Sequence, residues 1–315
     1  MNDSVTVSLP ARLHFGFLDM HGGLGRRFGS LGLAISGLRT RLTLRRAAVD
    51  SFAGPQAARA GAYLVSLRAV LGLQGAVALQ VDEAIPTHAG LGSGTQLALG
   101  VSAALRQLHG LPLDPAGDAL LLQRGERSGI GIGLFHQGGF VVDGGNGAVG
   151  HAPPIIARLP FPADWRIILL LDPARQGVHG DAELAAFRDL PKFPASMAAH
   201  ICRVTLMKIL PALAQAELAP FGAGLAEIQK LVGDHFAPAQ GGRFASPAVA
   251  GALDVLQRLA AHGPGQSSWG PTGFAFAPNE QKALRLCDAL KADPVSQGLD
   301  IRICRGLNHG LPSSD

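Results

Sequence analysis

The sequence predicts an α+β protein of two domains, and three features carry this prediction. The chain has 315 residues, which is enough for two domains of ordinary size. In the first half, an apolar β-like run at 76–81 leads through a glycine-rich turn into a helical pattern at 96–107. In the second half, the order strand, helix, helix, strand, helix, strand is typical of an α+β sandwich. The proline-rich stretch 151–162 favours a boundary between domains 1–155 and 156–315.

The elements of the first half follow from local patterns. Alternation of polar and apolar residues predicts a strand at 5–9, which runs into a polar, glycine-bearing segment at 10–19. A second strand is expected at 40–46, and helices are expected at 55–73 and 112–123.

A second glycine-dense region, 124–139, precedes a strand at 140–142. We interpret this region as a second anion site or as the other wall of the first, and a structural glycine hairpin is the alternative.

The second half contains further helical and extended patterns. A buried strand is expected at 165–171, and its polar loop is a usual position for site residues. A glycine-bearing turn at 265–272 runs into another strand, and the last strand is expected at 300–304. The helices predicted here are 181–188, 196–214, 222–234, 246–261 and 280–290.

Composition excludes several classes of protein. Hydrophobic residues make up 47% of the chain and charged residues 16%, so a sizeable core can form. The net charge of +4 comes from dispersed Lys and Arg, which does not favour a nucleic-acid partner. Cys202, Cys287 and Cys304 are widely spaced, which argues against a disulfide framework and a zinc site. With no signal-peptide pattern and no apolar run of about 18 residues, we expect a cytoplasmic protein without a membrane partner.

The stretch from Pro86 to Gln96 predicts a phosphate cradle. Its three glycines (Gly90, Gly92 and Gly94) allow close approach of the main chain to a ligand. Ser93 or Thr95 is expected to cap the helix behind, whose N–H groups and dipole favour an anion. The stretch is not a P-loop, because no Gly-Lys-Ser/Thr follows at the required spacing. An ordinary glycine turn into a helix is the alternative.

Arginine and histidine residues beside other glycines are further candidates. Arg26 and Arg27 lie between glycines on an expected hairpin, where two guanidiniums suit a phosphate or carboxylate. Solvated surface arginines are the alternative interpretation. Three histidines lie in or near glycine loops: His88, His136 and His179. Each is either a substrate contact or a polar residue satisfied within the protein, and the same alternatives hold for Arg175.

Three glycine motifs, at 10–19, 86–95 and 265–272, resemble those of the GHMP kinase superfamily. Pro-x-x-x-Gly-Leu-Gly-Ser is similar to its phosphate loop, and Gly-x-Ser-Ser-x-Gly-Pro-Thr to its third motif. This resemblance implies an N-terminal domain like the second domain of ribosomal protein S5 and a ferredoxin-like C-terminal domain. The segments 124–131 and 265–272 more specifically resemble a non-kinase branch, the β-ribofuranosylaminobenzene 5'-phosphate synthases.

The resemblance implies a reaction and a set of participants. Phosphoribosyl pyrophosphate would condense with 4-aminobenzoate, releasing pyrophosphate and CO₂, at the start of the pathway to methanopterin, a one-carbon carrier. It implies a divalent metal such as Mg²⁺, no ATP, flavin or pyridoxal phosphate, and a homodimer. The catalytic residues implied are His14, Asp19, Arg26 and Arg127. The substrate-binding residues implied are Arg27, Gly90, Leu91, Gly92, Ser93, Gly94, Thr95, Ser128, Gly129, Ser267, Ser268, Gly270 and Thr272.

The phosphate loop departs from the kinase pattern. Kinases of the superfamily usually carry paired serines where this chain has Ser93 and Gly94. The missing hydroxyl puts ATP use in doubt. An ATP-dependent small-molecule kinase remains the main alternative, and a catalytically silent anion-binding protein is a third.

Overall fold

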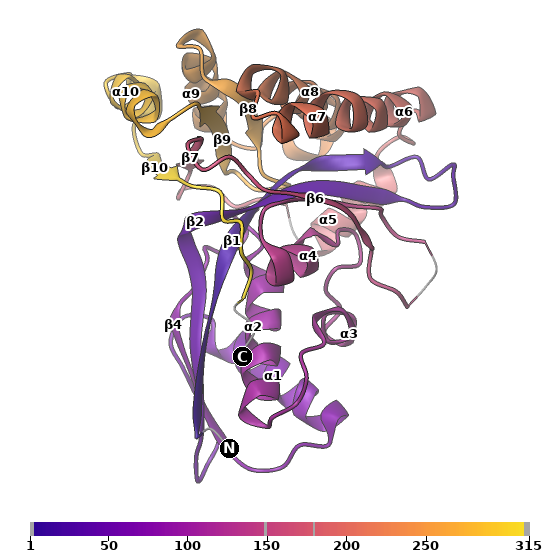
Figure 1. Ribbon diagram of the computed structural model, residues 1–315, viewed down its shortest axis with the longest axis vertical. Helices are drawn as coiled ribbons and strands as arrows, with labels where there is room; N and C mark the ends of the chain where they lie inside the picture. The colour runs from indigo at the N-terminus through magenta and orange to yellow at the C-terminus, as the bar shows by residue number, and fades with distance from the viewer. Residues whose placement is uncertain (1–2, 148–149, 179, 312–315) are drawn as a thin grey trace.

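The chain forms two β-sheets, and helices cover both of them (Figure 1). The computed structural model describes residues 3–147, 150–178 and 180–311. The first sheet has the order β3-β4-β2-β5-β6, and β1 pairs with the other edge of β2. All these pairs are antiparallel except β3 with β4. Its strands are β1 (Ser4–Asp19), β2 (Phe28–Arg46), β3 (Ser51–Ala53), β4 (Val77–Glu83), β5 (Phe140–Asp143) and β6 (Ile155–Leu159).

Strand β1 is much longer than the sequence pattern predicts. The strand expected at 5–9 continues through the glycine-bearing segment to Asp19, paired throughout with β2. The alternate residues Leu9, Ala11, Leu13 and Phe15 are fully buried, so core packing on one face sustains the strand. The register shifts between His14 and Gly16, and bulges of this kind commonly redirect side chains near sites.

Helices α1 (Ala57–Leu71) and α2 (Ser93–Leu108) cover the first sheet, together with α3 (Pro115–Leu121) and α4 (Ile130–Gln137). Helix α4 occupies most of the region where a glycine turn or hairpin was expected, so the expected local structure is wrong. The interpretation of this region as part of an anion site stays a prediction. Its apolar residues Ile130 and Leu134 are buried against β2 and β5. Its glycines permit close packing: a Cβ at Gly131 would lie 2.8 Å from a methyl group of Thr95. Tertiary packing here outweighs the low helix propensity of glycine.

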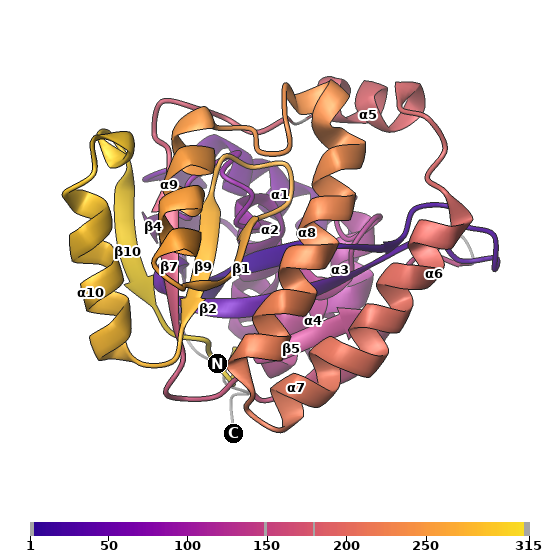
Figure 2. The ribbon, with the colours of Figure 1, turned by 90° about the horizontal axis from the view of Figure 1, so that it is seen from above.

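The second sheet is antiparallel and has the order β10-β7-β9-β8. Its strands are β7 (Arg166–Leu171), β8 (His262–Gln266), β9 (Gly273–Ala277) and β10 (Asp300–Cys304). Helices α9 (Pro247–Arg258) and α10 (Glu280–Lys291) pack on one face. Helix α8 (Leu218–Gln240) and β1 of the first sheet pack on the other (Figure 2). Because β6 belongs to the first sheet, the two sheets divide within residues 160–165.

The helix expected at 196–214 is interrupted. It consists of α6 (Ala195–Val204), a π-helical turn (Thr205–Ile209) and α7 (Leu210–Ala214). The turn precedes Pro211, which has no N–H to continue the α-helical ladder. By length and composition alone this 20-residue segment is apolar enough to cross a membrane, with a hydropathy of 1.3. In the fold it packs against α8 and β1, where Ile201 and Ile209 are fully buried.

One aromatic core joins the two sheets. Phe15 of β1 packs against Phe140 of β5 and Phe274 of β9, with ring centroids 5.7 and 5.0 Å apart. All three side chains have no exposed surface. Both sheets therefore support the loops that meet at the edge of this core.

Candidate functional site

The predicted phosphate cradle lies between β4 and α2. Gly92, with φ of 80°, is the N-cap of α2, and no side chain caps this helix, so the expected capping by Ser93 or Thr95 is wrong. Ser93 is instead the first helical residue, and it is 8% exposed. The first-turn N–H groups and the dipole of a 16-residue helix therefore face this loop without a competing side-chain acceptor in the described chain.

Ser267 joins the cradle to the second sheet. Its hydroxyl donates to the carbonyl of Gly90 at 2.8 Å and accepts the N–H of His14 at 3.0 Å. The N–H of Ser268 then donates to the carbonyl of His14 at 3.2 Å. A Cβ at Gly270 would lie 2.2 Å from the backbone of Ala89, so the two loops touch along their main chains. Three segments distant in sequence thus meet at one point.

A cavity of about 490 Å³ opens beside this junction. It brings together five of the predicted site residues: His14, Thr95, Arg127, Ser128 and Ser268. Its remaining lining residues come mainly from the loop before α4 and from α5 (Gly180–Asp189); they are Arg12, Phe17, Gln123, Arg124, Gly125, Glu126, Gly180, Glu183 and Leu184.

Arg12 is a cavity residue that the sequence reasoning did not single out. Its Nε and Nη1 are buried and have no hydrogen-bond partner in the described structure. Burial lowers the pKa of Arg12 to about 10, although attraction to Asp143 opposes this shift. The side chain packs on the cradle, since a Cβ at Gly92 would lie 2.7 Å from Arg12 Cγ. A buried donor-only group without an acceptor indicates a site for an anion. The sequence feature that could have identified Arg12 as a site residue is its position two residues before His14 on the same strand.

Two more arginines, Arg59 and Arg124, pack near the cradle against Tyr63, the single tyrosine of the chain. Arg59 of α1 donates from Nε to the hydroxyl of Tyr63 at 2.9 Å. The guanidiniums of Arg59 and Arg124 lie 5.7 and 5.6 Å from the Tyr63 ring. A Cβ at Gly94 would lie only 2.7 Å from Arg59 Nη2. The guanidinium of Arg59 therefore lies beside the position where the kinases carry the second serine.

Arg127 and Ser128 each have partners at the cavity wall. Arg127 donates to Glu183 of α5 at 2.6 Å and lies over the ring of Phe187. Ser128 is 2.6 Å from Ser30, which donates to the buried carboxylate of Asp143.

Asp143 orders the backbone of this wall. It accepts the N–H groups of Gly129 and Gly145 at 3.0 and 2.9 Å. Burial raises the pKa of Asp143, while these hydrogen bonds oppose the rise. Its interactions fix the loop that leads into α4.

His14 is buried as a neutral ring. It is 2% exposed, and burial, with the nearby Arg12, lowers the pKa of His14 to about 3. Its Nδ1 accepts the N–H of Gly16 at 3.2 Å, so the proton of the neutral ring lies on Nε2. That Nε2 is buried without a partner in the described structure.

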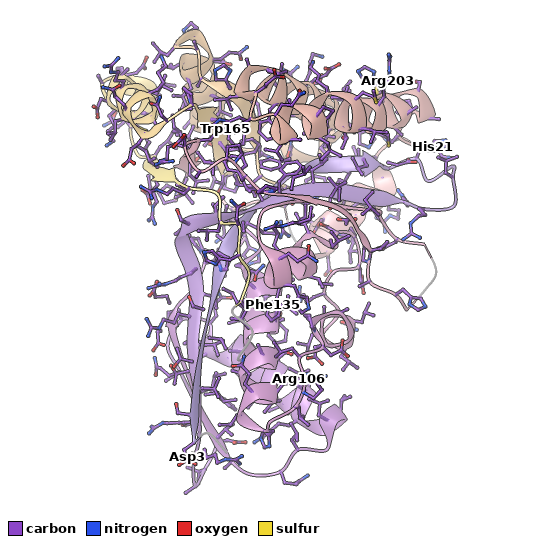
Figure 3. All side chains as sticks on the ribbon, viewed as in Figure 1. Asp3, His21, Arg106, Phe135, Trp165 and Arg203 are labelled. Carbon is purple, nitrogen blue, oxygen red and sulfur yellow. The ribbon has the colours of Figure 1, made fainter. Side chains whose placement is uncertain are left out.

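The structure does not bring Asp19, Arg26 and Arg27 to the cavity. They lie on the β1–β2 hairpin, which projects from the sheet near His21 (Figure 3). Asp19 accepts two N–H groups of the turn, at 2.8 and 2.9 Å. Arg26 donates to the carbonyls of Gly144 and Gly145 at 2.7 and 2.6 Å, and Arg27 donates to Met20 at 3.2 Å.

The other site residues predicted from the sequence lie in several different environments. Leu91 and Thr272 are buried, and Thr272 Oγ1 has no partner in the described structure. The carbonyl of His88 accepts an N–H from Gly177 at 2.8 Å. His136 and Arg175 are exposed and do not line the cavity. His179 lies outside the described residues.

No group of three or more His, Cys, Asp or Glu side chains is placed to hold a metal within the described ranges. Mg²⁺ commonly uses only one or two carboxylates together with substrate phosphates. Glu126 and Glu183 line the cavity and fit that requirement.

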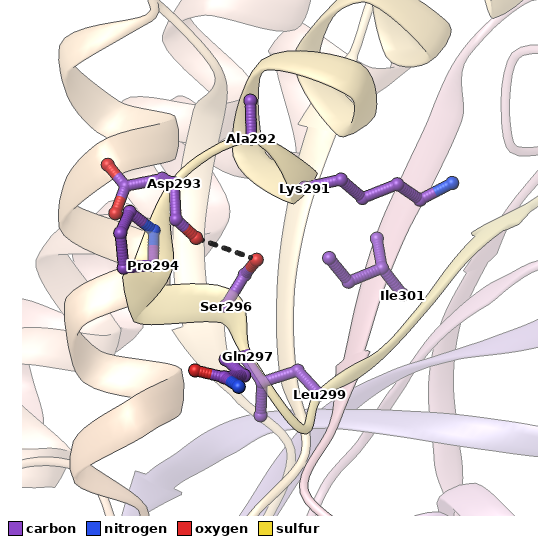
Figure 4. A pocket seen from close by; sticks show the side chains of 8 residues that line it. All are labelled: Lys291, Ala292, Asp293, Pro294, Ser296, Gln297, Leu299 and Ile301. Carbon is purple, nitrogen blue, oxygen red and sulfur yellow. Dashed lines mark hydrogen bonds between the residues drawn. The ribbon is translucent and has the colours of Figure 1, made fainter.

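A separate pocket of about 440 Å³ lies beside β10 (Figure 4). In it Ser296 donates to the carbonyl of Asp293 at 3.1 Å. None of its described lining side chains has a buried polar atom without a partner. It differs in this respect from the 490 Å³ cavity lined by Arg12, Arg124 and Arg127, called the arginine-lined cavity below.

The fold and this cavity define a two-domain protein of the GHMP kinase class. Residues 58–139 match the model for the GHMP kinases N terminal domain, and 209–295 match GHMP kinases C terminal. A homoserine kinase from Cytophaga hutchinsonii superimposes with a TM-score of 0.71 at 18% identity, covering 98% of this chain and 96% of its own. Mevalonate diphosphate decarboxylase from Staphylococcus aureus superimposes with 0.69 at 14% identity, covering 99% and 98%. These likenesses concern the fold alone.

The chain belongs to the family of β-ribofuranosylphenol 5'-phosphate synthases. The relative from Archaeoglobus fulgidus is 31% identical over 279 residues, covering 85% of this chain and 86% of the relative. The relative from Methanothermobacter thermautotrophicus is 28% identical over 293 residues, covering 85% and 87%. The resemblance stated from the sequence is confirmed, and the kinase alternative is not favoured.

Gly90→Ala should prevent the two loops from docking. The new Cβ would lie 2.0 Å from the Ser267 carbonyl, and φ at this position is 80°. Gly110→Ala is the matched control, because Gly110 also has positive φ but has no neighbouring atom within 4 Å. We expect the control to lose about 1 kcal/mol of unfolding free energy and Gly90→Ala to lose more than about 3 kcal/mol. Urea unfolding measures both, and equal losses would contradict the docking.

Arg12→Gln should weaken binding of inorganic pyrophosphate at least about tenfold, because one charge-assisted interaction is lost. Titration calorimetry measures the affinity. Arg41→Gln is the control, since Arg41 is an exposed arginine on β2, with 47% of its side chain accessible, and should change nothing. Equal affinities for the two variants would remove Arg12 from the anion site.

The protein should lose stability as pH falls below about 6.5. Unfolded chains protonate His14 near that pH, whereas folded chains do so only near its lowered pKa of about 3. Folded chains therefore bind fewer protons in this window, and His14 removes about 2 kcal/mol of unfolding free energy between pH 7 and pH 5. His14→Gln should reduce the pH dependence by that amount in urea unfolding. An unchanged slope would contradict a neutral buried His14.

Proposed function

We propose that this enzyme condenses phosphoribosyl pyrophosphate with 4-aminobenzoate, forming a β-ribofuranosyl-aryl 5'-phosphate with release of pyrophosphate and CO₂. The names of the relatives denote the corresponding phenol product. We further propose that it works in the cytoplasm, in the route to methanopterin.

The surroundings of the α2 N-terminus carry this proposal. Arg12 has unpartnered guanidinium nitrogens there, and Arg59 and Arg124 approach the same loop. Such a concentration of positive charge suits a pyrophosphate group, which is a leaving group in the proposed reaction. Gly94 in place of a second serine also supports a role other than kinase chemistry, and Arg59 Nη2 lies beside this position.

The substrate carries two separate anionic groups, and the cavity has two sets of partners for them. In this proposal Arg12, Arg59 and Arg124 bind the pyrophosphate at the first turn of α2. Arg127 and Ser128 bind the 5'-phosphate, which competes with Glu183 for the Arg127 guanidinium. The hairpin residues Asp19, Arg26 and Arg27 act indirectly, by shaping the turn and residues 144–145.

The proposed steps balance without an additional oxidant or proton donor. The bond from the ribose anomeric carbon to the pyrophosphate oxygen breaks, and pyrophosphate leaves with the electron pair. The ring carbon that carries the carboxylate forms a bond to the anomeric carbon. The carbon–carboxylate bond then breaks, CO₂ leaves, and its electron pair restores aromaticity. Guanidiniums that meet the leaving oxygens stabilise the charge that develops on them.

A divalent ion such as Mg²⁺ would add further charge neutralisation at the pyrophosphate. Glu126 is the carboxylate of this cavity that would hold it, because Glu183 is ion-paired with Arg127 at the position given to the 5'-phosphate. The buried, apolar side chain of Phe17 reduces water around the carboxylate, which favours loss of CO₂.

The test uses 4-aminobenzoate labelled at its carboxyl carbon, with phosphoribosyl pyrophosphate and Mg²⁺. We expect labelled CO₂ and pyrophosphate in equal amounts, and no CO₂ when phosphoribosyl pyrophosphate is omitted. Parallel reactions with 4-hydroxybenzoate show which acceptor is preferred. Formation of ADP from ATP and a small alcohol, without CO₂ from either acid, would overturn the proposal in favour of a kinase.

A further inference from the structure

A narrow recess lies next to the arginine-lined cavity, between β1, α8 and the loop that carries Ser268. Three phenyl or indole rings line one part of it: Phe236 lies 4.2 Å from Trp269 and 6.3 Å from Phe17, measured between ring centroids. Most of the other lining residues are glycines or polar side chains; they include Gln229, Gln240, Arg243 and Gln266. His14, Phe17 and Ser268 line both the recess and the cavity. The two spaces therefore meet along a shared wall.

Two of the side chains that line the recess carry a buried donor without an acceptor. The His14 ring carries its proton on Nε2, as the Gly16 contact requires, and the Trp269 indole carries one on Nε1. Both nitrogens are buried and unpartnered in the described structure, in side chains only 2% and 5% exposed. No described lining residue of the recess has a buried acceptor without a partner. A ligand that satisfies this recess must therefore supply acceptor atoms.

We propose that this recess is the binding site for the aromatic acid, a benzoate whose ring lies among Phe17, Phe236 and Trp269. This inference rests on the proposed function. Aromatic walls suit a planar ring, which packs edge-on or offset against them. The donors suit the oxygen atoms of a carboxylate.

The shared wall determines the orientation of the acid. The ring carbon that reacts is the one bearing the carboxylate, and it must approach the ribose, whose phosphates lie in the arginine-lined cavity. His14 lines both spaces, so its Nε2–H is the donor for the carboxylate. Trp269 lines only the recess, and its Nε1–H is the donor for the second carboxylate oxygen.

The recess must widen when the ring enters. Its free volume is about 20 Å³, which is room for one water at most. Phe187 of α5 packs edge-on against Trp269 and Phe236, with centroids 5.4 and 5.6 Å apart. No residue of α5 is buried, so this helix is the part of the aromatic wall that can withdraw with the least loss of packing.

The first experiment separates the two substrates kinetically. Trp269→Phe retains an aromatic ring but removes the N–H donor. We expect its KM for 4-aminobenzoate to rise about tenfold, as for one hydrogen bond to a charged group, while its KM for phosphoribosyl pyrophosphate stays unchanged. Trp165→Phe is the matched control, because Trp165 packs in the core against Phe161 and Phe221. It should change neither KM.

The second experiment observes binding directly. The chain has two tryptophans, so the Trp165→Phe protein reports from Trp269 alone. Benzoate should change the Trp269 fluorescence saturably, and acetate at equal concentration should not. His14→Gln in the same protein should weaken the benzoate response about tenfold.

The outcomes distinguish this inference from the proposed function. If CO₂ is released but Trp269→Phe alters neither KM, or both KM values equally, the recess is not the aryl site. Absence of a saturable benzoate response would also overturn it. If benzoate binds at Trp269 but no CO₂ is formed with either acid, the recess stands as an aromatic-acid site and the proposed reaction fails.

Discussion

Docking of the 265–272 loop onto the phosphate loop and β1 is the constraint on which the site depends. Ser267 supplies a single hydroxyl that donates to Gly90 and accepts from His14, so it connects three segments at once. The carbonyl of His14 in turn accepts the N–H of Ser268. Main-chain contact between the loops leaves no room for side chains at Gly90 and Gly270. The glycines at this junction therefore serve loop-to-loop contact as much as contact with a phosphate.

The site stores unfavourable free energy that a ligand can relieve. Arg12, His14 and Trp269 all keep buried nitrogens without partners in the described chain. Each such group costs stability in the free protein, because its hydrogen bonds to water are lost on folding. The shared aromatic core between the sheets provides the packing that tolerates this cost. Binding of acceptor-rich substrates would restore the missing hydrogen bonds.

Particular residues show how far the sequence could be interpreted. The strand–loop–helix unit around Gly92, and the glycine motif at 265–272, followed from residue types with strong local conformational preferences. The guanidiniums of Arg26 and Arg27 were correctly placed on a hairpin, where they bind backbone carbonyls, and their contact with a substrate stays a prediction. Arg59 escaped notice because helix α1 carries no local signal of its distant contact with Gly94. Helix α4 was missed because its glycines weaken the helical pattern.

The sequence by itself determined the α+β class, the family and the position of the phosphate loop, since these depend on periodicity, turn residues and motifs within a few positions of one another. The tertiary structure alone decided which positive charges gather beside the first turn of α2 and which aromatic side chains line the neighbouring recess. Arg12, Arg59 and Arg124 come from three separate segments, and only packing of α1 and the α4 loop on β1 and α2 brings them together. Long side chains have many rotamers, and the fold, through burial and hydrogen bonding, selects the one that each adopts.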